Sequence, residues 1–198
     1  MKTTRLIIVA VGGQGNLLSS RVLGEAAVAA NIHIGMSEIH GMAQRGGVVE
    51  SALVFGDAAS TIISDGEADV LLGFEPSETL RALKKCHSRS CVVTNMQPLP
   101  PFTVSIGKGN YPDLNQVTEL IKQKTDRLYA LNATELARQA GNMLSVNIVL
   151  LGALTATNIL PLTKEQMQDA IRKTVKKAFV DINLKAFEFG EQAITDRG

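Results

Sequence analysis

The chain has 198 residues, of which 45% are hydrophobic and 20% are charged, and its formal net charge is +1. This length allows one buried core, so we expect a single domain over residues 1–198, and the near-neutral charge gives no reason to expect nucleic acid or an acidic membrane surface as a partner. No apolar run reaches the roughly eighteen residues that span a bilayer, and no signal-type segment opens the chain, which predicts a cytoplasmic protein without a membrane partner.

Strands and helices are expected to alternate along the first two thirds of the chain. Residues 5–11 are short, β-branched and almost uncharged, as in a buried strand, and residues 14–30 carry apolar side chains at helical spacing. An extended pattern at 31–37 would complete a right-handed βαβ unit if the two strands are parallel. Further strands are expected at 48–55, 70–74, 91–95 and 127–131, and a helix at 76–85. The alternation predicts an α/β fold with a Rossmann-like, mostly parallel sheet flanked by helices.

The second half begins with a proline-rich stretch, residues 98–112, which we expect to be an excursion from the domain with a short strand at 103–106. After it, capping-box spacings at 113–116 and 132–135 predict two helices. An apolar helix is expected at 144–157. A further capping box predicts one long amphipathic helix, which begins after Thr163 and carries Met167, Ile171, Val175, Phe179 and Ile182. This helical last third would cover one face of the sheet or present a surface to another chain.

A first glycine-rich loop, Gly12-Gly13-Gln14-Gly15, follows the first strand and opens the first helix. Small residues there would let backbone N–H groups approach a phosphate at the positive end of the helix. Gly12 and Gly15 fit the G-x-G-x-x-G frame, with Ala10 in the first place and Glu38 where a ribose-binding acid is expected. Ala10 and the amide of Gln14 count against an NAD fingerprint. A tight turn that needs glycine only for packing is the open alternative.

A second glycine-rich segment runs from Ser37 to Gly47 and contains Glu38, His40, Gln44 and Arg45. An arginine can clamp a carboxylate or a phosphate, and a histidine can transfer protons near neutral pH. The alternative is an irregular loop whose polar groups satisfy one another. Because loops at the carboxyl ends of neighbouring strands of an open α/β sheet face one crevice, we expect both glycine-rich segments to share a site.

The only two cysteines, Cys86 and Cys91, lie four residues apart with His87 between them. They are too few to hold an iron–sulfur cluster, and a zinc site would have to recruit distant His33 or His40. We therefore expect reduced thiols and no metal site on this chain.

Taken together, the run from Val11 to Leu18 and the run from Ser37 to Gly47 resemble the gamma-type domain of the 2-oxoacid:ferredoxin oxidoreductases. The similarity continues through residues 68–76, 141–142 and 147–154, and so covers nearly the whole chain. The resemblance implies a subunit of an enzyme that oxidatively decarboxylates aryl-2-oxoacids to acyl-CoA and passes the electrons to ferredoxin. It also implies that thiamine diphosphate, magnesium and the iron–sulfur clusters lie on a larger (alpha) subunit.

From this resemblance we expect the isolated chain to be inactive and to complete a site on its partner. Glu38, His40, Gln44 and Arg45 would wall the crevice and steer an anionic 2-oxoacid or CoA. The loop at residues 12–15 would face a phosphate or pack against the larger subunit. Two other functions stay open: a free-standing dinucleotide-binding protein and a non-catalytic assembly subunit. The sequence does not select one 2-oxoacid, and whether the isolated chain forms a homodimer also stays open.

Overall fold

A computed structural model describes residues 3–41, 47–101, 104 and 106–196. In these residues the strands form one sheet in the order β2-β3-β1-β4-β5-β6. Four neighbouring strands are parallel: β1 (Thr4–Val11), β4 (Ala68–Gly73), β5 (Cys86–Asn95) and β6 (Arg127–Leu131). The prediction of a Rossmann-like, mostly parallel α/β sheet is therefore confirmed.

One strand runs against the others. β3 (Val48–Phe55) lies between β1 and β2 (Ile34–His40) and is antiparallel to both. β1 and β2 run in the same direction, as the expected βαβ unit requires, but β3 lies between them in the sheet. The connection from β2 to β3, residues 41–47, is short enough for an antiparallel hairpin but too short for a parallel crossover.

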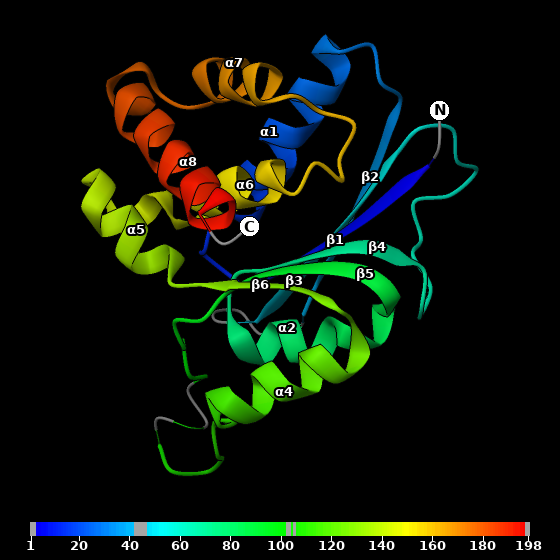
Figure 1. Cartoon of the computed structure of the whole chain (residues 1–198), viewed down its shortest axis with the longest axis vertical. Coiled ribbons are helices and arrows are strands. Elements are labelled where there is room, and N and C mark those ends of the chain that lie inside the picture. Colours follow the sequence, from blue (N-terminus) through cyan, green and yellow to red (C-terminus); the bar gives the residue numbers. More distant parts are fainter. Residues whose placement is uncertain (1–2, 42–46, 102–103, 105, 197–198) are drawn as a thin grey trace.

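Helices cover both faces of the sheet, as Figure 1 shows. On one face lie α2 (Pro76–Ala82) and α4 (Leu114–Lys124). On the other lie α1 (Asn16–Ala29), α5 (Ala133–Ala140), α6 (Val146–Ala156), α7 (Lys164–Thr174) and α8 (Val180–Thr195). The helices of the last third thus cover one face, as expected.

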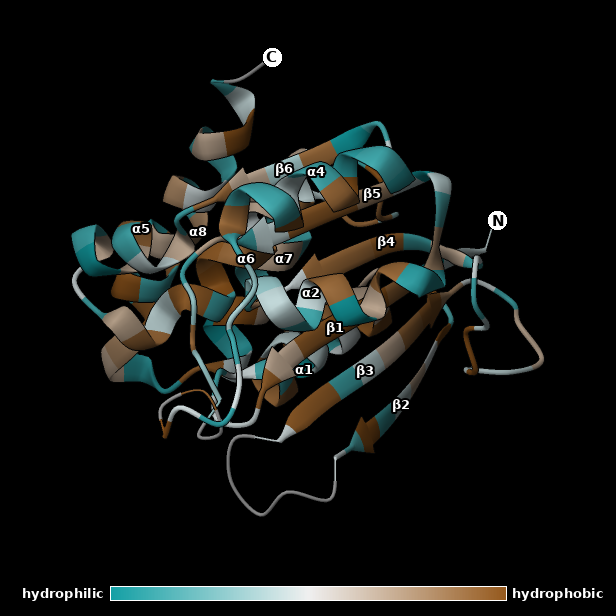
Figure 2. Cartoon of the chain, turned by 90° about the horizontal axis from the view of Figure 1, so that it is seen from below, coloured by the Kyte–Doolittle hydropathy of each residue, from teal (hydrophilic) through white to brown (hydrophobic). Residues whose placement is uncertain are grey.

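The core has two parts, one on each face of the sheet. Leu6 and Ile8 of β1 are buried under α1, α6 and α8, whereas Ile7 and Val9 are buried on the side of α2 and α4. This alternation follows from the two-residue period of a strand. In Figure 2 the central strands are accordingly coloured as hydrophobic. The central strands are buried on both faces, whereas no residue of the edge strand β2 is buried, so the carboxyl edge, where the parallel strands end, is the natural place for a site.

Helices α6 and α8 pack against each other through two glycines. A Cβ on Gly152 would lie 1.9 Å from the carbonyl oxygen of Phe187, and one on Gly190 would lie 1.9 Å from that of Val149. No larger side chain fits either position, so these two helices approach at backbone distance.

Two expectations for local structure are wrong. The long helix after Thr163 is two helices: α7 ends at Thr174, Val175 is extended, and α8 begins after the 3₁₀ turn η3 (Lys177–Phe179). The apolar spacing continues across the break, but the β-branched pair at 174–175 favours extended backbone. In the predicted strand 103–106, Val104 is helical, because the Val104 N–H bonds to Pro101 O at 2.9 Å. Thr103 and Ser105 lie outside the described residues.

Candidate functional site

The two glycine-rich segments meet at the carboxyl edge of the sheet. The Gly12 N–H donates to the carbonyl oxygen of Gly47 at 2.9 Å, and the Gly41 N–H donates to that of Val48 at 2.8 Å. The start of β3 lies between the ends of β1 and β2 and brings Gly47 to Gly12. The described parts of the two segments therefore lie side by side, although their strands are not neighbours, and a shared site stays a prediction.

The first loop is a tight turn closed by its own glutamine. The Val11 N–H donates to Gln14 Oε1 at 2.8 Å, and Gln14 Nε2 donates to the carbonyl oxygen of Phe74 at 3.4 Å. Gly15 has a φ of +90° and precedes α1 without a side-chain cap. A Cβ on Gly15 would lie 3.0 Å from Nδ2 of Asn147 in α6. The loop therefore joins β1 to the end of β4 and to α6, and the positive φ together with the close Asn147 side chain favours glycine at position 15.

Beside this loop is a cavity of about 370 Å³. Its lining comes from the glycine loop, from the segment after β5 and from the chain around α5 and α6: Gly13, Gln14, Asn95, Gln97, Pro98, Leu99, Thr134, Met143, Leu144 and Val146. The wall combines amide and hydroxyl groups with exposed apolar side chains, of which Leu144 is 85% exposed. A ligand with both polar groups and an apolar portion would suit such a lining.

The polar side of the cavity is held rigidly by Asn95, at the end of β5. Its Nδ2 donates to Phe74 O and to Thr134 Oγ1, both at 3.2 Å, and its Oδ1 accepts the Ala133 N–H at 3.0 Å. One buried amide thus connects the ends of β4 and β5 to the start of α5. Asn95, Thr134 and the apolar residues at 143–144 were not predicted as site residues, although a polar residue at the carboxyl end of a buried strand is a usable signal.

The second glycine-rich segment contributes a chain of polar groups on β2 and β3. His40 Nε2 lies 3.4 Å from Glu38 Oε2, and the Ser51 hydroxyl donates to Glu38 Oε1 at 3.2 Å. Asn16 Nδ2, at the start of α1, donates to Ser51 Oγ at 3.0 Å. The structure therefore links Glu38 and His40 to each other and to the first helix. The predicted site residues Gln44 and Arg45 lie outside the described residues.

The proline-rich stretch is anchored at the same edge by a buried carboxylate, Glu75. Its Oε2 accepts the Glu78 N–H at 2.9 Å, its Oε1 accepts the Leu99 N–H at 3.3 Å, and the Tyr111 hydroxyl also donates to Oε1. Burial and this bond to a carboxylate raise the pKa of Tyr111 well above its ordinary value. Glu75 therefore serves both as the cap of α2 and as the anchor of the segment that forms one wall of the cavity.

The described part of the chain contains no group of three or more His, Cys, Asp or Glu that could hold a metal ion. Cys86 and Cys91 are buried free thiols. Burial raises the pKa of Cys86 to about 11 and that of Cys91 to about 12. Among the described helices, none is both long and apolar enough to cross a membrane.

Comparison with known proteins gives a consistent family. The model of the family described as pyruvate ferredoxin/flavodoxin oxidoreductase matches residues 5–193. Indolepyruvate oxidoreductase subunit IorB of Methanothermobacter thermautotrophicus is 40% identical over 185 residues, which cover 93% of this chain and 94% of that protein.

Two solved structures have the same fold. One is the gamma subunit of keto/oxoacid ferredoxin oxidoreductase from Geobacter sulfurreducens, with a TM-score of 0.71 and 24% identity over 98% of this chain and 99% of that one. The other is 2-oxoglutarate:ferredoxin oxidoreductase from Magnetococcus marinus, with a TM-score of 0.74 and 16% identity over 99% of this chain and 32% of that one. With a family match over almost the whole chain and a relative 40% identical along nearly its full length, this chain belongs to the pyruvate ferredoxin/flavodoxin oxidoreductase family.

Proposed function

We propose that this chain is the small subunit of an indolepyruvate:ferredoxin oxidoreductase, which oxidatively decarboxylates an aryl-2-oxoacid to acyl-CoA in the cytoplasm. The observation that carries the proposal is the full-length relationship to subunit IorB. Residues 1–198 would act as one domain, and a larger subunit would complete the active site.

In this proposal the larger subunit holds thiamine diphosphate, magnesium and the iron–sulfur clusters. Two cysteines in the full sequence are too few for a cluster, which supports that division. The bound thiamine group would supply the carbanion chemistry, and the clusters would carry electrons singly to ferredoxin. The small subunit would bind and orient the reactants at its carboxyl edge.

The second glycine-rich segment would handle anionic groups. Arg45 would pair with the carboxylate of the 2-oxoacid or with a phosphate of CoA, because a guanidinium binds such groups through two parallel hydrogen bonds. His40 would exchange a proton with the ligand at Nε2, which lies 3.4 Å from Glu38 Oε2. Gln44 would donate a neutral hydrogen bond to the same ligand.

The cavity beside the first glycine loop would hold the less charged part of CoA. Its amide and hydroxyl groups suit the amides of the CoA arm, and Met143 and Leu144 suit its methylene groups. Gly13 and Gly15 would bring backbone N–H groups near a phosphate at the start of α1. The Gly12 N–H, bonded to Gly47 O, would hold the second glycine-rich segment beside them. The turn-closing bonds of Gln14 support a positioning role for its side chain.

The test reconstitutes the complex from the full chain and the larger subunit, with Arg45→Ala and His40→Ala variants. We expect kcat/KM for indolepyruvate or CoA to fall by about tenfold or more in each variant, since a hydrogen bond to a charged group contributes about 1.5–3 kcal/mol. Arg21→Ala, on an exposed part of α1, is the control and should keep the wild-type rate. Wild-type turnover in both variants, with the complex intact, would contradict the assigned roles.

The same preparation separates the two other functions. A nucleotide released from the purified chain by heat would favour a free-standing dinucleotide-binding protein. Full turnover by the larger subunit alone would favour a non-catalytic assembly role.

A further inference from the structure

A second pocket lies at the opposite edge of the sheet, where the parallel strands begin. Its volume is about 280 Å³, and it is lined by Asp69, His87, Arg89, Arg127 and Ile159. Asp69 is near the start of β4, His87 and Arg89 are near the start of β5, and Arg127 begins β6. Since a strand rises about 3.3 Å per residue, this pocket is roughly 20 Å from the glycine loops.

An irregularity in the sheet exposes two of these side chains. In the β4–β5 pairing, Ala68 faces Cys86 but Val70 already faces Cys91, so residues 87–90 bulge out of the ladder. Two hydrogen bonds through Ser90 hold the bulge: the His87 N–H donates to Ser90 Oγ at 2.8 Å, and Ser90 Oγ donates to Ala68 O at 2.6 Å in a buried bond. Bulges of this kind commonly redirect side chains at functional sites.

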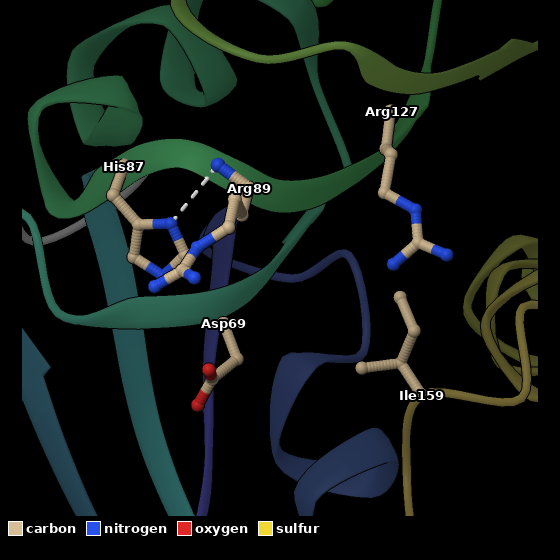
Figure 3. A pocket seen from close by; sticks show the side chains of 5 residues that line it. All are labelled: Asp69, His87, Arg89, Arg127 and Ile159. Carbon is tan, nitrogen blue, oxygen red and sulfur yellow. Dashed lines mark hydrogen bonds between the residues drawn. The ribbon is translucent and has the colours of Figure 1, made fainter.

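The hydrogen bonding of His87 fixes its tautomer. The Arg89 N–H donates to His87 Nδ1 at 3.1 Å, so Nδ1 accepts and the proton of the neutral ring is on Nε2. Figure 3 shows His87, Arg89 and Asp69 on one side of the pocket and Arg127 on the other, where its guanidinium points toward Ile159. The pocket therefore offers an imidazole N–H and two guanidinium groups as donors.

The positive charges exceed the negative charge. Neither Arg89 nor Arg127 forms an ion pair within the described ranges of the chain. Asp69 is the one carboxylate in the lining, and its Oδ2 already accepts the Arg5 N–H at 2.8 Å. Two unpaired guanidinium groups against one carboxylate make the pocket attractive to an anion.

We propose that this pocket binds a phosphate group, either free or carried on a small organic molecule. Two guanidinium forks and an imidazole N–H present more donors than the two oxygens of a carboxylate can use, whereas a phosphate has enough acceptor oxygens. The volume is just below the range of about 300–1,000 Å³ of small-molecule sites, which favours a small phosphate ester over a dinucleotide. A hydroxyl on that ester could donate to Asp69.

The test is calorimetric titration of the full chain with inorganic phosphate and with glycerol 3-phosphate at constant ionic strength. We expect saturable binding, weakened at least about tenfold by Arg89→Gln and by Arg127→Gln, since each removes hydrogen bonds to a charged group. The control variant combines Arg21→Gln and Arg172→Gln, which removes two positive charges from exposed helix surfaces and should bind as wild type. Tighter binding of glycerol 3-phosphate would identify a phosphate ester, and equal binding would identify free phosphate.

Three results would overturn the proposal: no saturable heat with the wild-type chain, equal affinity in the wild type and both single variants, or acetate bound as tightly as phosphate. Circular dichroism melting of each variant checks its fold, and Arg89→Lys, which keeps the charge, should retain part of the affinity. Because the measurement is of binding, its failure would leave the proposed oxidoreductase function untouched.

Discussion

At the scale of single residues, the Gln14 side chain closes the first glycine-rich loop, beside which the cavity lies. Its amide joins Val11 to Phe74 across the turn. We expect Gln14→Ala to lower the free energy of unfolding by about 1–3 kcal/mol, because a part-buried donor and acceptor lose their partner. Urea denaturation measures the change, and Gln123→Ala on the exposed side of α4 is the control, with an expected change within about 0.5 kcal/mol. An equal loss in both variants would contradict the turn-closing role.

A second prediction at the scale of single residues concerns the reactivity of the two cysteine thiols. With pKa values of about 11 and 12, Cys86 and Cys91 are almost entirely protonated at pH 8, the former with roughly one thiolate in a thousand molecules. We expect a thiol reagent to modify the native chain far more slowly than the urea-unfolded chain. Burial raises the pKa of both thiols, so the thiolate form is scarce at neutral pH. The rate of thiol modification should therefore rise only as the pH approaches 11. Rapid labelling of native protein at pH 8 would show that the thiols are not buried.

At the scale of the helices, the close contact of α6 with α8 depends on two glycines, Gly152 and Gly190. We expect Gly190→Ala to lower the free energy of unfolding by at least about 2 kcal/mol, because its Cβ would lie 1.9 Å from Val149 O and the helices would have to separate. Thermal melting compares it with Glu188→Ala, an exposed position on the same helix. Similar melting temperatures for the two variants would contradict backbone-distance packing.

At the scale of the whole molecule, the sequence predicts most elements because local rules govern them. The caps at Asp113, Asn132 and Thr163 accept the backbone N–H groups that their spacing predicts. Buried parallel strands are recognisable from their uninterrupted apolar runs. The place of β3 between β1 and β2 was not predictable from such local patterns, since strand order depends on contacts between residues that are far apart in the sequence.

The site was partly predictable for the same reason. The meeting of Gly12 with Gly47 follows from both segments ending at one edge of the sheet. The cavity beyond it draws on Gln14, Asn95 and Leu144, which come from three distant parts of the chain. No local spacing relates such residues, so only the folded structure brings them together.

The carboxylate of Glu75 couples two distant residues of the segment at 98–112 to each other. One oxygen receives both Leu99 and Tyr111, at the two ends of this segment, while the other oxygen caps α2. Displacing either Leu99 or Tyr111 would leave an oxygen of the buried Glu75 side chain with one hydrogen-bond partner fewer, which costs free energy. The backbone at Leu99, which lines the cavity, and the side chain of Tyr111 are thus coupled through one oxygen, so a ligand that displaced Leu99 would also disturb the partner of Tyr111.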